Sequence, residues 1–273
     1  MPFIENEGAN LFYDVQGSGP NLLFLHGGGG NATIWYNQIS HFAQSYTCVV
    51  MDARGFGRSH PYGPDIGSLD LMPRDAFAVM DALGMEKAGI VCQSMGAWTG
   101  LRMCLQQPDR LWGFVGVSSP MGIDFPPAIE NAITFVASVA ESGLGIEDVA
   151  LSEDFRQNQP EQFWLYRHTN MFNVGVLRGE ELGVAQSTAM ANLFAPDAMI
   201  PLAKLREVTV PTVLMSGGQD KLVLTAHMRE MADNFKGAAF EVFETSGHSP
   251  YFEVPEEFNA RVDTHLKKFL ESA

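Results

Sequence analysis

A serine between small residues breaks an otherwise apolar run in the stretch GIVCQSMGAWTG, which spans residues 89–100. Ser94 follows consecutive apolar residues typical of a buried strand and precedes a run with helical spacing. A tight strand-to-helix turn would leave Ser94 exposed and strained, and it needs small residues such as Cys92 and Gly96 two positions away. The stretch therefore predicts a nucleophile elbow with cysteine at its first glycine position, and an ordinary helix cap is the alternative.

Two further residues could turn this serine into a nucleophile. A serine needs a general base, and His248 lies in TSGHSP, a loop after the last predicted strand. The base needs an orienting acid, and Asp220 lies in SGGQDKLV, just past another predicted strand. The chain order Ser94, Asp220, His248 is the order used by folds with this elbow. Asp124, which follows a different strand, is the rival for the acid.

A glycine run offers the remaining part of such a site. HGGGG spans residues 26–30 after a predicted buried strand, and four glycines cost conformational entropy unless backbone must approach closely. An oxyanion hole needs one N–H from such a loop and one from the residue after the nucleophile, which favours Gly28 and Met95. A flexible turn is the alternative. A phosphate loop is disfavoured because no Lys and Ser/Thr follow the glycines.

The elements that must position these residues alternate along the chain. Helical patterns over 70–84, 95–108, 224–235 and 256–270 are interleaved with short apolar runs. Such alternation predicts an α/β fold, with a doubly wound, mostly parallel sheet preceded by an antiparallel hairpin. The predicted strands cover residues 21–27, 47–52, 88–93, 111–118, 211–217 and 238–244.

The region 120–205 shows helical and loop-like patterns without a clear strand. We therefore expect a core domain formed by residues 1–119 and 206–273 and a helical insertion over 120–205. An apolar pocket beneath such an insertion would suit a hydrophobic ligand. The residues expected to line this pocket are Gly27, Trp98, Phe125, Trp164, Tyr166, Met171, Phe172 and Tyr251.

Composition limits the possible partners and location. The 273 residues carry a net charge of −15, which disfavours nucleic acid as a partner. No apolar stretch is long enough for a membrane span, and the N-terminus shows no secretory signal. Three cysteines without a signal favour reduced thiols and a cytoplasmic location. We expect no metal, no cofactor, and a monomer or homodimer.

In the order HGGGG, MDARGFGRS, VCQSMGA, SGGQD and SGHSPYFEVPEEFN, these motifs make the chain resemble the α/β-hydrolase superfamily. The resemblance implies that the insertion is a helical cap over the active site, with structural roles for Asp52 and Arg54. His26 is expected to give supporting hydrogen bonds. The dehalogenases and epoxide hydrolases of this superfamily carry aspartate at the elbow, so Ser94 argues against both activities.

The expected activity is hydrolysis of a carboxylic ester or lactone of a hydrophobic small molecule through an acyl-enzyme. Hydrolysis of C–C bonds in ring-fission products is an alternative, with Arg167 or Arg178 meeting a substrate carboxylate. The C–C hydrolases typically carry a tryptophan shortly after the histidine, where this chain has Tyr251 and Phe252. A ligand receptor that keeps the triad and a cofactor-free perhydrolase are two further alternatives.

Overall fold

An eight-stranded sheet organises the computed structural model, which describes residues 2–61, 63–171, 184, 188, 189 and 191–272. The strand order is β1-β2-β4-β3-β5-β6-β9-β10, antiparallel at β1–β2 and β2–β4 and parallel elsewhere. This confirms the predicted α/β class and the antiparallel hairpin at the N-terminus. The strands are β1 (Phe3–Asn6), β2 (Ala9–Gly17), β3 (Asn21–Leu25), β4 (Thr47–Met51), β5 (Ala88–Gln93), β6 (Leu111–Val117), β9 (Thr212–Gly217) and β10 (Ala239–Phe243).

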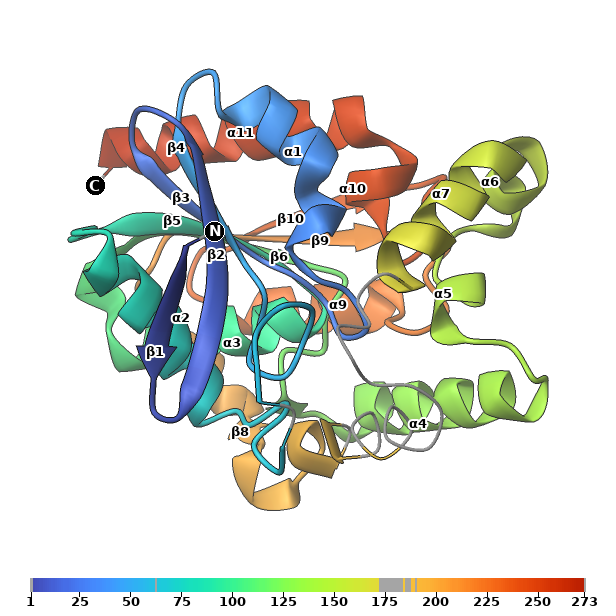
Figure 1. The fold of residues 1–273 in the computed structure, drawn as a ribbon. Helices are drawn as coiled ribbons and strands as arrows, with labels where there is room; N and C mark the ends of the chain where they lie inside the picture. Colours follow the sequence, from blue (N-terminus) through green and yellow to red (C-terminus); the bar gives the residue numbers. More distant parts are fainter. Residues whose placement is uncertain (1, 62, 172–183, 185–187, 190, 273) are drawn as a thin grey trace.

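Helices cover both faces of the sheet (Figure 1). α1 (Tyr36–Phe42) and α11 (Pro255–Ser272) pack on one face, while α2 (Leu71–Ala82), α3 (Met95–Gln106) and α9 (Thr225–Asn234) pack on the other. Strands β5, β6 and β9 are buried along their whole length, which explains their uninterrupted apolar sequences. The shorter helices are η1 (Ala32–Trp35), η2 (Pro108–Arg110), η3 (Pro196–Ala198), η4 (Leu202–Glu207) and α10 (Pro250–Glu253).

The register of the parallel strands brings their carboxyl ends to one edge. Leu25 pairs with Cys92, Gln93 pairs with Val117, and Gly217 pairs with Phe243. Each of these residues is at or next to the end of its strand. The loops that follow β3, β5, β9 and β10 therefore meet at the same edge, where ligand sites of such sheets form.

Within the described part of the region predicted to be an insertion, helices lie beside this edge (Figure 1). They are α4 (Pro126–Glu141), α5 (Ile146–Val149), α6 (Glu153–Asn158) and α7 (Pro160–Met171). A two-stranded parallel sheet of β7 (Ile123–Asp124) and β8 (Ile200–Pro201) joins the two ends of the region. These two strands correct our expectation of a strand-free region, because two-residue strands leave no periodic pattern in the sequence.

No helix in the described residues is both long and apolar enough to span a membrane. The three cysteines, Cys48, Cys92 and Cys104, are buried and unpaired.

Candidate active site

Ser94 has the backbone conformation of a strained turn. Its φ of 49° and ψ of −116° lie outside the regions that non-glycine residues favour. The backbone is fixed there by hydrogen bonds from the Ser94 N–H to the Val117 carbonyl (2.9 Å) and from the Ser119 hydroxyl to the Ser94 carbonyl (2.7 Å). The Ser94 side chain makes no capping hydrogen bond to α3. This geometry favours the predicted elbow over an ordinary helix cap.

Two glycines let α3 lie directly against the sheet behind this turn. A Cβ atom at Gly96 would lie 2.2 Å from the Leu25 carbonyl oxygen, so only glycine fits there without a backbone shift. A Cβ atom at Gly100 would lie 2.7 Å from the Cys92 sulfur. The larger residue at the first position of the elbow motif is therefore accommodated by the missing side chain at Gly100.

Asp220 and His248 form a buried pair. Asp220 Oδ2 lies 2.8 Å from His248 Nδ1, while Asp220 Oδ1 accepts hydrogen bonds from the Leu222 and Val223 N–H groups, both at 2.9 Å. The Asp220 side chain has no solvent exposure and that of His248 only 7%. The rival acid Asp124 is exposed on β7. The structure thus joins the predicted histidine to Asp220.

The turn of the predicted base also contacts the turn of Ser94. The Gln93 side-chain amide donates to the His248 carbonyl oxygen at 3.3 Å, and Gln93 immediately precedes Ser94. The turns that carry the predicted nucleophile and base therefore pack against each other, although they are more than 150 residues apart in the chain.

The glycine run after β3 lies against the same elbow. The Gly30 N–H donates to the Gly27 carbonyl at 3.2 Å, and Gly29 lies between them with a φ of 77°, a conformation that favours glycine. A Cβ atom at Gly27 would lie 3.1 Å from Ser94 Cβ, and one at Gly28 would lie 3.9 Å from Met95 Cβ. The two predicted oxyanion donors, Gly28 and Met95, are thus neighbours beside Ser94.

His26 ties the glycine run to the loop after β4. The Ala53 N–H donates to His26 Nε2 at 2.9 Å, which leaves the proton on Nδ1, 2.7 Å from the Gly27 carbonyl oxygen. Burial lowers the pKa of His26 and keeps the ring neutral. Asp52 adds a second tie, because its carboxylate accepts the Ala32 N–H (2.7 Å) and the Arg58 N–H (2.8 Å). These bonds match the supporting roles expected for His26 and Asp52.

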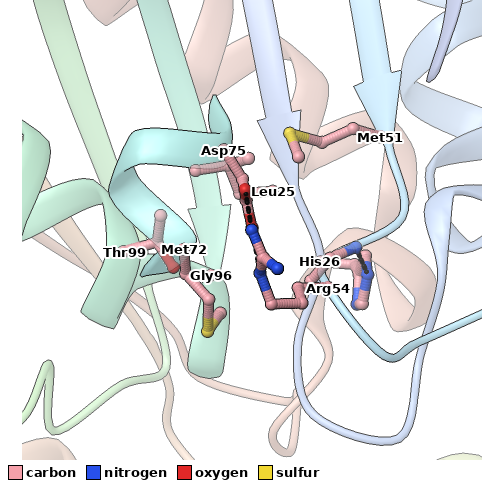
Figure 2. A pocket seen from close by; sticks show the side chains of 9 residues that line it. Leu25, His26, Met51, Arg54, Met72, Asp75, Gly96 and Thr99 are labelled. Carbon is pink, nitrogen blue, oxygen red and sulfur yellow. Dashed lines mark hydrogen bonds and ion pairs between the residues drawn. The ribbon is translucent and has the colours of Figure 1, made fainter. Parts of the chain in front are cut away.

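The Arg54 side chain points toward Asp75 (Figure 2). Its guanidinium makes two hydrogen bonds to the Asp75 carboxylate, at 2.6 and 2.9 Å, and donates to the carbonyls of Asn6 and Glu7. A cavity of about 10 Å³ lies beside this pair. Because that volume suffices for about one water molecule, the cavity is too small for a substrate.

The predicted pocket residues lie in different surroundings. Trp98 packs in one cluster with Met95, next to the elbow. Phe125, Tyr166 and Tyr251 are buried, and the Tyr166 hydroxyl lies 2.9 Å from the Ser249 hydroxyl beside the predicted base. Trp164 is 51% exposed on α7. Phe172 and the side chain of Met171 lie outside the described residues. Roles in substrate binding stay predictions for all of these residues and for Gly27.

Sequence reasoning missed Glu253, a buried carboxylate in the turn that follows His248. Only its position five residues after the histidine, inside the otherwise apolar run SPYFEV, could have singled it out. Within the described residues, no group of three or more His, Cys, Asp or Glu side chains could hold a metal ion.

Known proteins resemble this chain over nearly its whole length. A solved structure, described as Est816, an N-acyl homoserine lactone degrading enzyme, has 30% identity and a TM-score of 0.80, covering 96% of this chain and 99% of its own. The 2-hydroxy-6-oxo-6-phenylhexa-2,4-dienoate hydrolase of Comamonas testosteroni is 28% identical, over 91% of this chain and 88% of its own. A protein of Azorhizobium caulinodans, provisionally named carbamate hydrolase RutD, is 27% identical, over 95% and 96%.

The family model described as alpha/beta hydrolase fold matches residues 20–255. That range contains the glycine run, the elbow at Ser94, and the pair formed by Asp220 and His248. The chain therefore belongs to the α/β-hydrolase family.

Proposed function

We propose that this protein is a serine hydrolase that cleaves a carboxylic ester or lactone of a hydrophobic small molecule through an acyl-enzyme. The observation that carries the proposal is the strained turn at Ser94 packed against the turn of the His248–Asp220 pair. Ser94 replaces the aspartate that would indicate dehalogenase or epoxide hydrolase chemistry. The lactone-degrading neighbour at 30% identity supports a lactone among the substrates to be tested.

The geometry supports a two-stage reaction. His248 removes the hydroxyl proton of Ser94 as the oxygen attacks the carbonyl carbon, and Asp220 stabilises the resulting imidazolium. The N–H groups of Gly28 and Met95 bind the oxyanion. His248 then protonates the leaving alcohol, and a water molecule repeats the sequence on the acyl-enzyme to release the acid and free Ser94.

The test is turnover of p-nitrophenyl esters of increasing acyl length and of N-acyl homoserine lactones, with wild type and Ser94→Ala measured side by side. The variant should lose on the order of 10⁴-fold or more in kcat. Ser40→Ala is the matched control, because it removes an exposed serine hydroxyl on α1 that bonds only to the Asn37 carbonyl in the described residues. Full activity in Ser94→Ala would overturn the proposal.

Hydrolysis of a C–C bond in a ring-fission product is the second candidate, favoured by the relative from Comamonas testosteroni. Of the two arginines predicted to bind a substrate carboxylate, Arg167 lies in the described part of the chain. It forms an ion pair with Asp148 at 3.2 Å and packs over Trp164. Arg178 lies outside the described residues. This candidate would be favoured if the protein hydrolysed a ring-fission dienoate and did not hydrolyse the esters and lactones. Carbamates belong in the same panel because a relative is named for them.

A further inference from the structure

A buried carboxylate lies directly behind the turn that carries His248. Glu253 ends α10, five residues after the histidine, and is 8% exposed. Among the described residues, no ion pair includes it. Burial raises the pKa of Glu253, while hydrogen bonds from its neighbours act in the opposite direction. Burying a carboxylate without a paired cation costs free energy unless hydrogen bonds replace those lost to water.

The two oxygens of this carboxylate bind different parts of the chain. Oε1 accepts the Gly247 N–H at 2.8 Å and the Ser246 hydroxyl at 3.1 Å, both in the turn before His248. Oε2 accepts the Ser152 N–H at 2.8 Å, and Ser152 belongs to the helical insertion. One side chain thus bridges the base turn and the insertion.

The insertion also touches the base turn directly. The His248 N–H donates to the Ala150 carbonyl at 2.6 Å. A Cβ atom at Gly247 would lie 2.6 Å from the Ser152 nitrogen and 2.8 Å from the Ala150 oxygen, so the two backbones are in contact. The turn 246–248 is therefore held between segment 150–152 on one side and Glu253 on the other.

We propose that Glu253 is a positioning residue that couples the insertion to the general base, by fixing segment 150–152 and the His248 turn with one carboxylate. The proposal rests on the proposed role of His248 as the base. A movement of segment 150–152 would shift the His248 imidazole through these bonds. No contact between the insertion and Ser94 would be needed. Oε1 and Oε2 both act as acceptors, so a side-chain amide, which has one acceptor, cannot replace the carboxylate.

The first test substitutes Glu253→Gln and measures kcat, KM and the rate at which a fluorophosphonate inactivates Ser94. Active-site titration normalises each rate to folded, reactive protein. We expect kcat and the inactivation rate to fall together by about 10- to 100-fold, as for a misplaced catalytic group, with KM nearly unchanged. A lower melting temperature with unchanged rates per active site would mean a structural role and would overturn the proposal.

The second test breaks the bridge from the insertion side. Ser152 has a φ of −58°, a value that proline adopts, so Ser152→Pro removes the N–H donor with little demand on φ. Glu153→Pro is the matched control, because Glu153 is the exposed first residue of α6, where proline is tolerated, and this substitution keeps both the N–H and the hydroxyl of Ser152. We expect Ser152→Pro to lower kcat and Glu153→Pro to leave it unchanged. Equal effects of the two variants would contradict the coupling.

A spectroscopic readout separates this proposal from the proposed function. The proton on His248 Nδ1, bonded to Asp220, should give a far-downfield proton resonance, identified by its loss in His248→Ala. We expect that resonance to shift or broaden in Glu253→Gln and Ser152→Pro but not in Glu153→Pro. An unchanged resonance in the first two would overturn the positioning role. The serine-hydrolase function would be overturned if the wild-type protein reacted with none of the esters, the lactones and the fluorophosphonate. In that case the resonance would still decide the role of Glu253.

Discussion

Asp220 shows how hydrogen bonds can fix the orientation of one side chain. Two backbone N–H groups, those of Leu222 and Val223, donate to Oδ1, which leaves Oδ2 for His248. The carboxylate cannot rotate without losing both backbone bonds. The imidazole is therefore held with its Nδ1 proton toward Asp220 and its Nε2 available to accept a proton.

The first prediction concerns this orientation. In Asp220→Asn the amide oxygen should keep the two backbone bonds, which turns the NH₂ group toward His248 Nδ1 and forces the wrong tautomer. We expect kcat for a p-nitrophenyl ester to fall on the order of 10⁴-fold, with the fold retained by circular dichroism. Asp124→Asn is the matched control at an exposed position, and a comparable loss there would transfer the role of the acid to Asp124.

His26 leads to a prediction about acid stability. Its pKa is lowered in the folded protein, so below the unfolded-state value of about 6.5 the unfolded chain binds more protons than the folded one. The free energy of unfolding should therefore decrease as the pH falls through that value. Protonated Nε2 would also face the Ala53 N–H, which needs an acceptor.

The measurement is urea unfolding of wild type and His26→Gln at about pH 7.5 and pH 5.5. We expect the variant to be less stable at the higher pH but to lose less stability on acidification. The difference between the proteins isolates His26 from buried acids such as Asp75 and Glu253, whose raised pKa values act with the opposite sign. Parallel pH profiles for the two proteins would contradict the prediction.

At the scale of elements, one helix sets the position of the nucleophile. α3 begins at Met95, directly after the elbow, and contacts the sheet through Gly96 and Gly100. The obstacle at Gly96 is backbone of β3 and its loop, whereas the obstacles at Gly100 are side chains of Cys92, Phe114 and Ile90. The two glycines therefore offer a matched comparison within a single helix.

We predict that both Gly96→Ala and Gly100→Ala destabilise the protein by about 1–3 kcal/mol, because each overpacks the helix–sheet contact. Only Gly96→Ala should also lower kcat per folded molecule, because α3 must move away from Leu25 and take the Met95 N–H with it. Adding Cys92→Ala should restore part of the stability of Gly100→Ala and none of that of Gly96→Ala. Urea unfolding and kcat measured together test all three statements.

The sequence predicted the strands of the parallel sheet to within about two residues, because strands buried on both faces have continuous apolar sequences. It did not predict α1, whose seven residues follow a 3₁₀ turn, or the two-residue strands β7 and β8. At the candidate site, motif order predicted Ser94, Asp220 and His248, and their catalytic roles stay predictions. Glu253 was not predicted, because its burial depends on Ser152, a hundred residues earlier in the chain.

At the scale of the whole molecule, 32 acidic and 17 basic side chains give the net charge of −15. Such a field repels anionic substrates and leaves neutral ones unaffected, and salt screens it. We predict that kcat/KM for an ester bearing a carboxylate rises several-fold between about 20 and 200 mM NaCl. The value for p-nitrophenyl butyrate, the neutral control, should stay constant.

The opposite result would be equally specific. A kcat/KM for the anionic ester that falls with salt would mean that positive groups near the entrance outweigh the overall charge. That outcome would favour substrates with a carboxylate, including the ring-fission dienoates of the second candidate function.

The pairing of β7 with β8 has a consequence for how this protein could vary over evolution. Ile123 lies opposite Ile200, so the segment between these two residues begins and ends at nearly the same point. For a loop with joined ends, each doubling of length adds only about 0.6 kcal/mol of closure entropy. Natural selection could therefore lengthen, shorten or replace the parts of this segment that do not contact the His248 turn at small thermodynamic cost. Substrate preference would change while segment 150–152 keeps its bonds to that turn.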